Sequence, residues 1–255
     1  MLNSRQAKIL SVVVKEYTQT ATPVSSGILV KKYQLEYSPA TVRNEMMALE
    51  EAGLLLKPHI SSGRIPSDKG YRYFVDNLMD QRELSREYQK KLEMELLRER
   101  TKNARMARTV AKLLSGMSHC VAVSGIVEKD EYYDFGMHAL LDDPEYAKLD
   151  EISRLSCALD LIDENVDVIL EKIKDDKTGI FIGQENPIKE IRNYSMVVSP
   201  YKFESGERGL VAIIGPKRMK YNRNKSLIDF IRKILSGKSV MILVLITNGS
   251  IIFLY

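Results

Sequence analysis

The chain has 255 residues, of which 44% are apolar and 28% are charged, and its formal net charge is +4. This length predicts one or two domains, and the apolar fraction excludes a predominantly disordered chain. Two cysteines are too few for a disulfide framework, and no apolar secretory signal follows Arg5 and Lys8, so we expect a cytoplasmic protein.

The charge is distributed unevenly along the chain. The net charge is +3 over residues 1–79, +4 over 80–112, −11 over 113–186 and +8 over 187–255. This pattern argues against nucleic acid binding along the whole length, and it allows a basic N-terminal module beside an acidic one.

The first 79 residues predict three helices in succession. Apolar residues at helical spacing predict one helix with Ser4 as its N-cap and a second over Val24–Tyr33. The third helix has the clearest start, because Ser38 is a good N-cap and Pro39 is favoured at the first helical position. It runs to Ala52, and Gly53 follows as a left-handed C-cap.

A short hairpin is predicted next. Leu54–Leu56 and Arg64–Pro66 are strand-like segments on either side of a polar loop, and Ser67 can cap a fourth helix that follows. Helix, helix, helix, hairpin and helix is the order of a winged helix-turn-helix, which we therefore predict for residues 1–79.

The remainder predicts a linker helix and an α/β domain. Residues 80–117 read as one helix with at most one break, and residues 118–238 alternate between strands and helices. The expected elements are a strand over Val121–Val127, a polar connection over 130–133, helices within 135–173, strands over Gly179–Gly183, Tyr194–Val198 and Leu210–Ile214, and a helix over Leu227–Leu235.

The C-terminal segment, residues 239–255, is strongly apolar. Asn248-Gly249 between two apolar runs predicts a β-hairpin. The run Val240–Ile246 is far shorter than the ~20 residues that a membrane helix needs. A buried hairpin is therefore favoured over a membrane tail or an engineered or mistranslated end.

No residue pattern points to catalysis. The nucleophile elbow, the phosphate-binding Walker loop and the dinucleotide-binding glycine motif are all missing from the sequence. The sequence therefore predicts no enzyme, no metal site and no cofactor. We interpret the remaining candidates as core, surface or loop residues, with both cysteines buried: His59, His119, His138, Cys120, Cys157, Asp142-Asp143 and Asp175-Asp176.

The third helix has the composition of a DNA-reading helix. If Val42 points inward, then Ala40, Asn44, Met47 and Glu51 point outward and Arg43 flanks them. An arginine can pair with guanine and an asparagine with adenine in the major groove. The candidate DNA-binding residues are Ser38, Thr41, Arg43 and Asn44.

The loop of the hairpin is the candidate wing. Small hydroxyl residues, a glycine and a basic residue suit a loop that lies along phosphates or in the minor groove. Its residues are His59, Ser61, Ser62, Gly63 and Arg64, and we expect positive surroundings from Lys57, Arg64, Lys69 and Arg72. A plain amphipathic helix and a plain surface hairpin remain the alternative.

Six segments together make the chain recognisable. Three lie in the N-terminal part, namely Ser38–Met46, Leu49–Leu55 and Pro58–Asp76, and three follow at Leu140–Tyr146, Ile180–Asn186 and Gly215–Tyr221. They resemble the HrcA family, the heat-inducible transcription repressors of bacteria. The resemblance implies a homodimer that binds an inverted-repeat operator, called CIRCE, upstream of chaperone genes. It also implies a GAF-like α/β domain and dependence on the GroE chaperonin for active folding.

The chain departs from the family pattern in one place. Only about Val127 to Asp134 spans the gap in which the family carries part of the GAF-like sheet and an inserted dimerisation domain. We therefore expect a short form without the usual dimer interface. Our hypothesis is that Val240–Tyr255 replaces the lost sheet strands or dimer contacts.

Two other functions remain open from the residues alone. The first is a winged-helix module that binds protein, with the acidic 113–186 segment as a docking surface. The second is a regulator gated by a small molecule that binds the GAF-like half near Phe181, Tyr194 or Tyr201.

Overall fold

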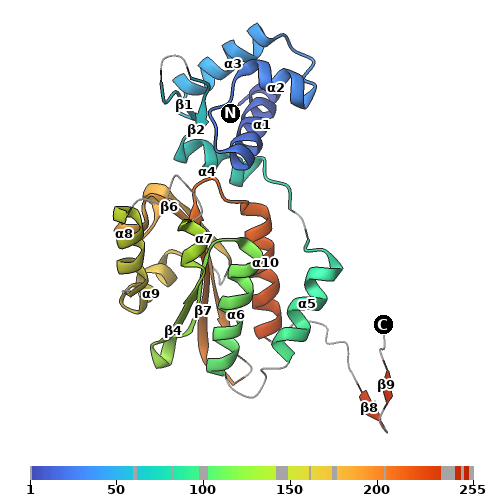
Figure 1. Ribbon diagram of the computed structural model, residues 1–255, viewed down its shortest axis with the longest axis vertical. Coiled ribbons are helices and arrows are strands. Elements are labelled where there is room, and N and C mark those ends of the chain that lie inside the picture. The colour runs from blue at the N-terminus through green and yellow to red at the C-terminus, as the bar shows by residue number, and fades with distance from the viewer. Residues whose placement is uncertain are drawn as a thin grey trace.

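The computed structural model describes residues 2–59, 62–81, 83–97, 103–141, 149–160, 162–173, 177–203, 205–236, 245–247 and 250–252. It is a mixed α and β structure (Figure 1), in which a helical N-terminal unit lies above a domain built on a central sheet.

The N-terminal unit contains the predicted order of elements. A small core from three helices holds it together, with Ile9, Leu29, Val42 and Leu49 all fully buried. The elements are α1 (Ser4–Thr20), α2 (Ser26–Tyr33), α3 (Pro39–Glu51), β1 (Leu55–Leu56), β2 (Ile65–Pro66) and α4 (Asp68–Asn77).

Local capping explains most helix ends in this unit. Ser67 accepts a hydrogen bond from the Gly70 backbone N–H at 3.0 Å, and Gly53 has a φ of 73°, as expected for a left-handed C-cap. The prediction for α1 was wrong by one residue. Asn3 is the cap, because its Oδ1 accepts from the Gln6 N–H at 2.8 Å and the Gln6 Oε1 accepts from the Asn3 N–H at 3.3 Å.

The second helix starts two residues later than predicted. Its N-cap is Ser25, and Val24 is instead part of an isolated β-bridge with Arg64, with both backbone hydrogen bonds at 2.9 Å. The predicted linker helix is also shorter at its start, since helix begins only at Arg86. It consists of α5 (Arg86–Leu97) and α6 (Asn103–Ser118), which pack against each other.

The second domain is built on a five-stranded antiparallel sheet with the strand order β4-β3-β7-β6-β5. Figure 1 shows α8 and α9 on one face, and α6 and α10 on the other. This arrangement agrees with the expected GAF-like α/β domain. Its elements are β3 (Val121–Ile126), β4 (Glu131–Phe135), α7 (Met137–Leu141), α8 (Leu149–Asp160), α9 (Ile162–Lys172), β5 (Gly179–Ile182), β6 (Tyr194–Lys202), β7 (Arg208–Pro216) and α10 (Tyr221–Leu235).

Alternate residues of the central strands supply two separate cores. Met196 and Val198 face the cluster under α8 and α9, whereas Val197 belongs to the other cluster. That second cluster also includes the core of the N-terminal unit. The N-terminal unit is therefore joined to one face of the sheet by continuous apolar packing.

Three predictions in this domain are corrected. Residues 131–135 form the edge strand β4, where a polar connection over 130–133 and a helical region from Phe135 were expected, because pairing with β3 satisfies their backbone. Strands β6 and β7 and helix α10 are all longer than predicted. Cys120 is buried as expected, but Cys157 is exposed on α8.

The C-terminal hairpin forms, with β8 (Leu245–Thr247) antiparallel to β9 (Ser250–Ile252). The Asn248-Gly249 turn and the side chains of this hairpin lie outside the described residues, so its expected burial does too. The two strands make a sheet of their own, separate from the five-stranded sheet. The described residues of the tail therefore add no strand to the larger sheet, which goes against the hypothesis that Val240–Tyr255 replaces strands of that sheet.

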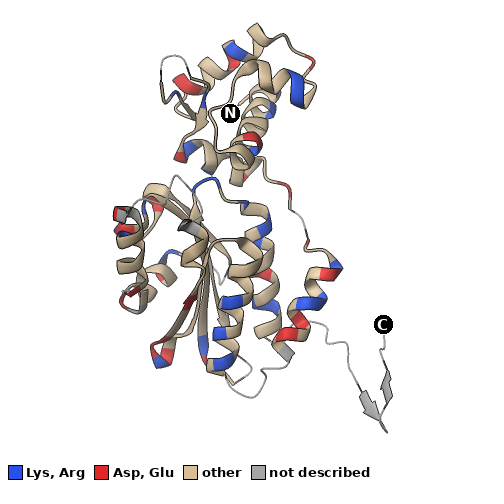
Figure 2. Ribbon diagram, viewed as in Figure 1, with Lys and Arg blue, Asp and Glu red and all other residues tan. Residues whose placement is uncertain are grey.

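The uneven charge now has a structural location. Figure 2 shows acidic residues on α8 and α9, and basic residues along α6 and α10 on the opposite face of the sheet. Helix α6 contains no acidic residue, and its Arg105, Arg108 and Lys112 are exposed. Part of the acidic stretch read from the sequence thus lies on the face of the sheet that α8 and α9 cover.

Candidate nucleic-acid interface

Helix α3 begins with an ordered polar cap. The Ser38 hydroxyl accepts the Thr41 backbone N–H at 3.1 Å, and the hydroxyl groups of the two residues are 2.9 Å apart. Ser38, Pro39 and Ala40 are all exposed. The first turn of the helix is therefore fixed internally and open to solvent, with further backbone N–H groups that can bind a phosphate.

The outward face of α3 is the one that the sequence predicts. Val42 and Met46 are buried, whereas Asn44 and Met47 are exposed, Met47 to 45%. Arg43 is also exposed. In the described part of the chain, the side chains of Arg43 and Asn44 make no hydrogen bond or ion pair. Both can therefore bind an external partner without breaking a contact.

The loop between β1 and β2 is closed by one serine. The Ser62 hydroxyl accepts the His59 N–H at 2.9 Å and donates to the His59 carbonyl oxygen at 2.7 Å. His59 is exposed, and Ser61 lies outside the described residues. Ser62 therefore shapes the loop, and its hydroxyl is engaged in doing so.

The side chain of Arg64 points toward α3. Its Nε donates to the Glu50 carboxylate at 2.8 Å, and the Arg64 side chain is only 12% exposed. Its backbone pairs with Val24 at the same time. Gly63 makes this approach possible, because a Cβ there would collide with the Val24 backbone. The base of the loop is thus fixed to both α3 and the start of α2.

The basic residues expected around the loop have different positions and partners. Lys57 is exposed, and Lys69 donates to the Ala52 carbonyl oxygen at 3.0 Å. Arg72 does not face the loop, because it pairs with Glu185 of the second domain. Sequence reasoning also missed Glu50, the partner of Arg64, since no local pattern links residues 14 positions apart.

The other candidate sites have different surroundings. Tyr194 and Tyr201 are 1% and 4% exposed, and the Tyr201 hydroxyl donates to the Gly125 carbonyl oxygen. Burial raises the pKa of Tyr201, so this hydroxyl stays protonated. A groove of about 1420 Å³ is lined by the α4–α5 connection, the ends of β6 and β7 and one side of α10. Tyr201 forms part of its wall.

No group of three or more His, Cys, Asp or Glu residues in the described ranges could hold a metal ion. No described helix is both long enough and apolar enough to cross a membrane.

A family model, that of the HrcA protein C terminal domain, matches residues 68–224. This range is more than half of the chain. The chain belongs to the HrcA family. The match begins at the first residue of α4 and ends in the first turn of α10, so it includes α4 with the second domain.

Relatives in this family extend the match over nearly the whole chain. The heat-inducible transcription repressor HrcA of Pelotomaculum thermopropionicum is 27% identical over 334 residues, covering 92% of this chain and 96% of the relative. That of Chloroflexus aggregans is 44% identical over 123 residues, or 48% of this chain and 33% of the relative.

The longer alignment exceeds the 255 residues of this chain, so it includes positions of the relative that have no counterpart here. A crystal structure described as that of a hypothetical protein shares the fold, with a TM-score of 0.74 and 20% identity. It covers 93% of this chain and 98% of its own.

Proposed function

We propose that this protein represses chaperone operons of the heat-shock response by binding an inverted-repeat operator of the CIRCE type. In this proposal the N-terminal unit is a winged helix-turn-helix and α3 is its recognition helix. The carrying observation is the exposed face of α3, on which Arg43 and Asn44 have no partner within the described chain. Membership of a repressor family supports the same conclusion.

The contacts to bases come from the middle of α3. The major groove is about 12 Å wide and accepts a helix. Arg43 can donate two hydrogen bonds to a guanine, and Asn44 can pair with an adenine. Thr41, Ser38 and the first backbone N–H groups of α3 then lie against a phosphate and fix the register of the helix.

The wing contributes shape as well as contacts. His59 and Ser61 at its tip are proposed to meet the DNA backbone, together with the backbone N–H groups around Ser62 and Gly63. Arg64 was predicted as a direct contact. Its pairing with Glu50 supports a different role, in which it holds the wing against α3.

An inverted repeat requires two-fold symmetry, so we propose a homodimer. The short form lacks the inserted dimerisation domain of its relatives, which the overlong alignment supports. We further propose that residues 240–255 contribute dimer contacts in place of those of the missing domain. Deleting them should then dissociate the dimer in light scattering, and a stable dimer would contradict this.

We also propose a cytoplasmic location and folding assisted by the GroE chaperonin.

The decisive experiment selects binding sites from random duplex DNA with the purified full-length protein. We expect enrichment of an inverted repeat, and an affinity that falls steeply with salt because several cations contact phosphates. Arg43→Ala should abolish this selectivity while circular dichroism stays unchanged. Lys112→Ala removes another exposed cation, from α6, and is the matched control. Failure to enrich any sequence would overturn the proposal and favour a protein-binding module.

A further inference from the structure

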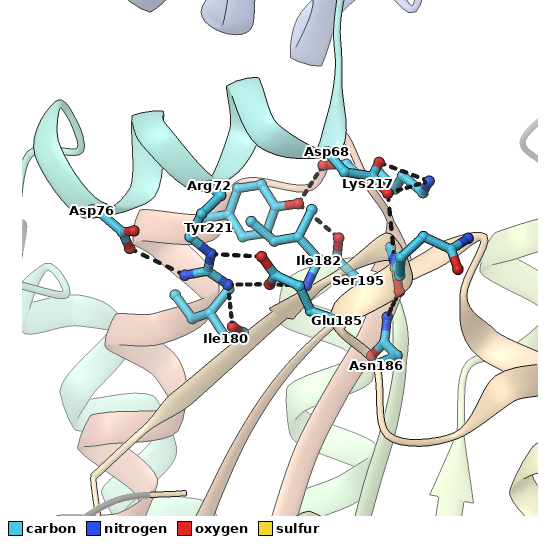
Figure 3. Close-up of polar contacts among 12 residues, drawn as sticks. Asp68, Arg72, Asp76, Ile180, Ile182, Glu185, Asn186, Ser195, Lys217 and Tyr221 are labelled. Carbon is cyan, nitrogen blue, oxygen red and sulfur yellow. Dashed lines mark hydrogen bonds and ion pairs between the residues drawn. The ribbon is translucent and has the colours of Figure 1, made fainter. Parts of the chain in front are cut away.

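Helix α4 carries an arginine, Arg72, that hydrogen-bonds to the second domain and to its own helix. Figure 3 shows Arg72 facing the second domain. Its Nε and Nη2 donate to the two oxygens of Glu185, at 3.0 and 2.5 Å, and Nη2 also donates to the Ile180 carbonyl oxygen at 2.5 Å. Its Nη1 donates to Asp76 at 3.1 Å. Burial opposes the charge of Arg72, but these carboxylates outweigh it and raise its pKa.

A second ion pair lies one turn earlier on α4. Lys217, in the connection that follows β7, is 2.8 Å from Asp68 Oδ1, and the Gln184 N–H donates to Asp68 Oδ2 at 3.3 Å. Gly183 has a φ of 55°, and a Cβ at this position would collide with the Asp68 carboxylate. The turn after β5 is therefore built for close approach to α4.

Two buried tyrosines fill the space between the ion pairs. The rings of Tyr71 on α4 and Tyr221 on α10 are 6.0 Å apart, and each residue is 2% exposed. The Tyr221 hydroxyl donates to the Lys217 carbonyl oxygen at 2.5 Å and lies 2.7 Å from the Ser195 hydroxyl. Burial raises the pKa of Tyr221, so the donor remains protonated.

The opposite side of α4 belongs to the N-terminal unit. Phe74 is buried in the shared core, and Gly70 lets the helix lie directly against the Leu54 carbonyl group. A single helix is thus packed rigidly into both units. We name the contact of Asp68, Tyr71 and Arg72 with Glu185, Lys217 and Tyr221 the α4 joint.

We propose that the α4 joint positions the two recognition helices of the repressor dimer, and that Asp68 and Arg72 are positioning residues that contact no DNA. This inference rests on the proposed function. Three segments that carry the family resemblance, Pro58–Asp76, Ile180–Asn186 and Gly215–Tyr221, supply all six residues of the joint. A rigid joint fixes the separation of the two α3 helices before binding, so the second half-site binds at a high effective concentration.

The test compares one half-site with the complete inverted repeat. In Glu185→Gln the bidentate partner of Arg72 loses its charge but keeps its size. We expect affinity for the inverted repeat to fall on the order of tenfold or more, because linkage of two sites gives roughly 10²–10⁴. Affinity for a single half-site should stay within about twofold. Arg72→Lys should recover part of the loss that Arg72→Gln produces.

Glu128→Gln is the matched control, because Glu128 pairs with Arg208 through a 2.8 Å contact elsewhere in the second domain. It should change neither affinity. Asp68→Asn loosens the other side of the joint and replaces Glu185→Gln if that variant fails to fold. Equal losses on both DNA targets, or no loss on either, would overturn the proposal.

A distance measurement makes the result independent of DNA. Cys157 is exposed and Cys120 is buried, so one spin label on Cys157 and another on Lys31→Cys report the separation of α8 and α2. With unlabelled protein in excess, we expect a narrow distance distribution that broadens in Glu185→Gln. A distribution that stays narrow in this variant would refute the joint as the positioning element. If the wild type binds no inverted repeat, the proposed function fails while this measurement still tests the joint.

Discussion

Two arginines of the N-terminal unit have opposite surroundings and should give opposite phenotypes. Arg43 is exposed and has no partner among the residues that the structure describes, whereas Arg64 is paired with Glu50. Arg43→Ala should abolish the sequence selectivity of binding, because the proposed base contact is lost. Arg64→Ala should weaken binding to every duplex about equally, because the wing is displaced. Binding-site selection with both variants separates these outcomes, and a changed sequence preference in Arg64→Ala would contradict the assignment.

Gly63 should be one of the least replaceable residues of the wing. A Cβ there would overlap the Val24 backbone, so Gly63→Ala must displace the bridge to Arg64. We expect a loss of about 1–3 kcal/mol in the free energy of unfolding, as for other overpacked sites. Gly27 on α2 is the control, because a Cβ there meets open space and Gly27→Ala should be neutral or stabilising. Urea denaturation measures both.

At the scale of an element, the start of α3 allows stability and DNA binding to be separated. Ser38→Ala removes the cap and should lower the free energy of unfolding by about 1 kcal/mol. Ser38→Asp keeps a capping oxygen, so stability should be retained. Its negative charge would face a phosphate, however, and operator affinity should fall. Unchanged affinity in Ser38→Asp would place this end of α3 away from the DNA.

The contact between α1 and α2 should make stability depend on pH. Glu16 accepts a hydrogen bond from Tyr33 at 2.9 Å and lies 2.7 Å from Lys32. The Lys32 hydrogen bond mainly lowers the pKa of Glu16 below 4.5, against the effect of burial. This contribution is complete above the unfolded-state pKa, and it is lost as pH falls through the lower folded-state value.

Thermal unfolding between neutral and acidic pH tests this expectation. Glu16→Gln should be less stable than the wild type at neutral pH, and the difference should shrink as the solution is acidified. Glu51→Gln, at an exposed position on α3, should show no such trend. A constant difference across the pH range would mean that Glu16 acts only through packing.

Local signals in the sequence were sufficient for some elements and insufficient for others. Ser38, Pro39 and Gly53 mark the two ends of α3 within the chain itself, and the structure agrees. Strand β4 was missed because an edge strand with polar residues such as Asp134 carries no apolar alternation. This segment is a strand because its backbone pairs with β3, and that pairing is a contact which the pattern of residues 131–135 does not show.

At the scale of the whole molecule, the unpredictable features are contacts between distant residues. The outward face of α3 could be read from helical periodicity alone. Arg72 and Glu185 are 113 positions apart, and nothing in the spacing around Arg72 distinguishes it from a DNA-contacting cation of the wing. Arg64 was assigned to the DNA for the same reason. Periodicity shows which way a side chain points, but the partner that it meets depends on the tertiary fold.

The shared helix α4 has a practical consequence for dissecting this protein. A fragment that ends after α4 would expose Tyr71 and Arg72 to water, because it would lack Tyr221 and Glu185, which contact them. A fragment that begins after α4 would expose the opposite half of the same contact, including Glu185 and Tyr221. Cutting the chain on either side of α4 therefore breaks this contact, and exchanging N-terminal units between relatives would require exchanging the surface beneath α4 as well.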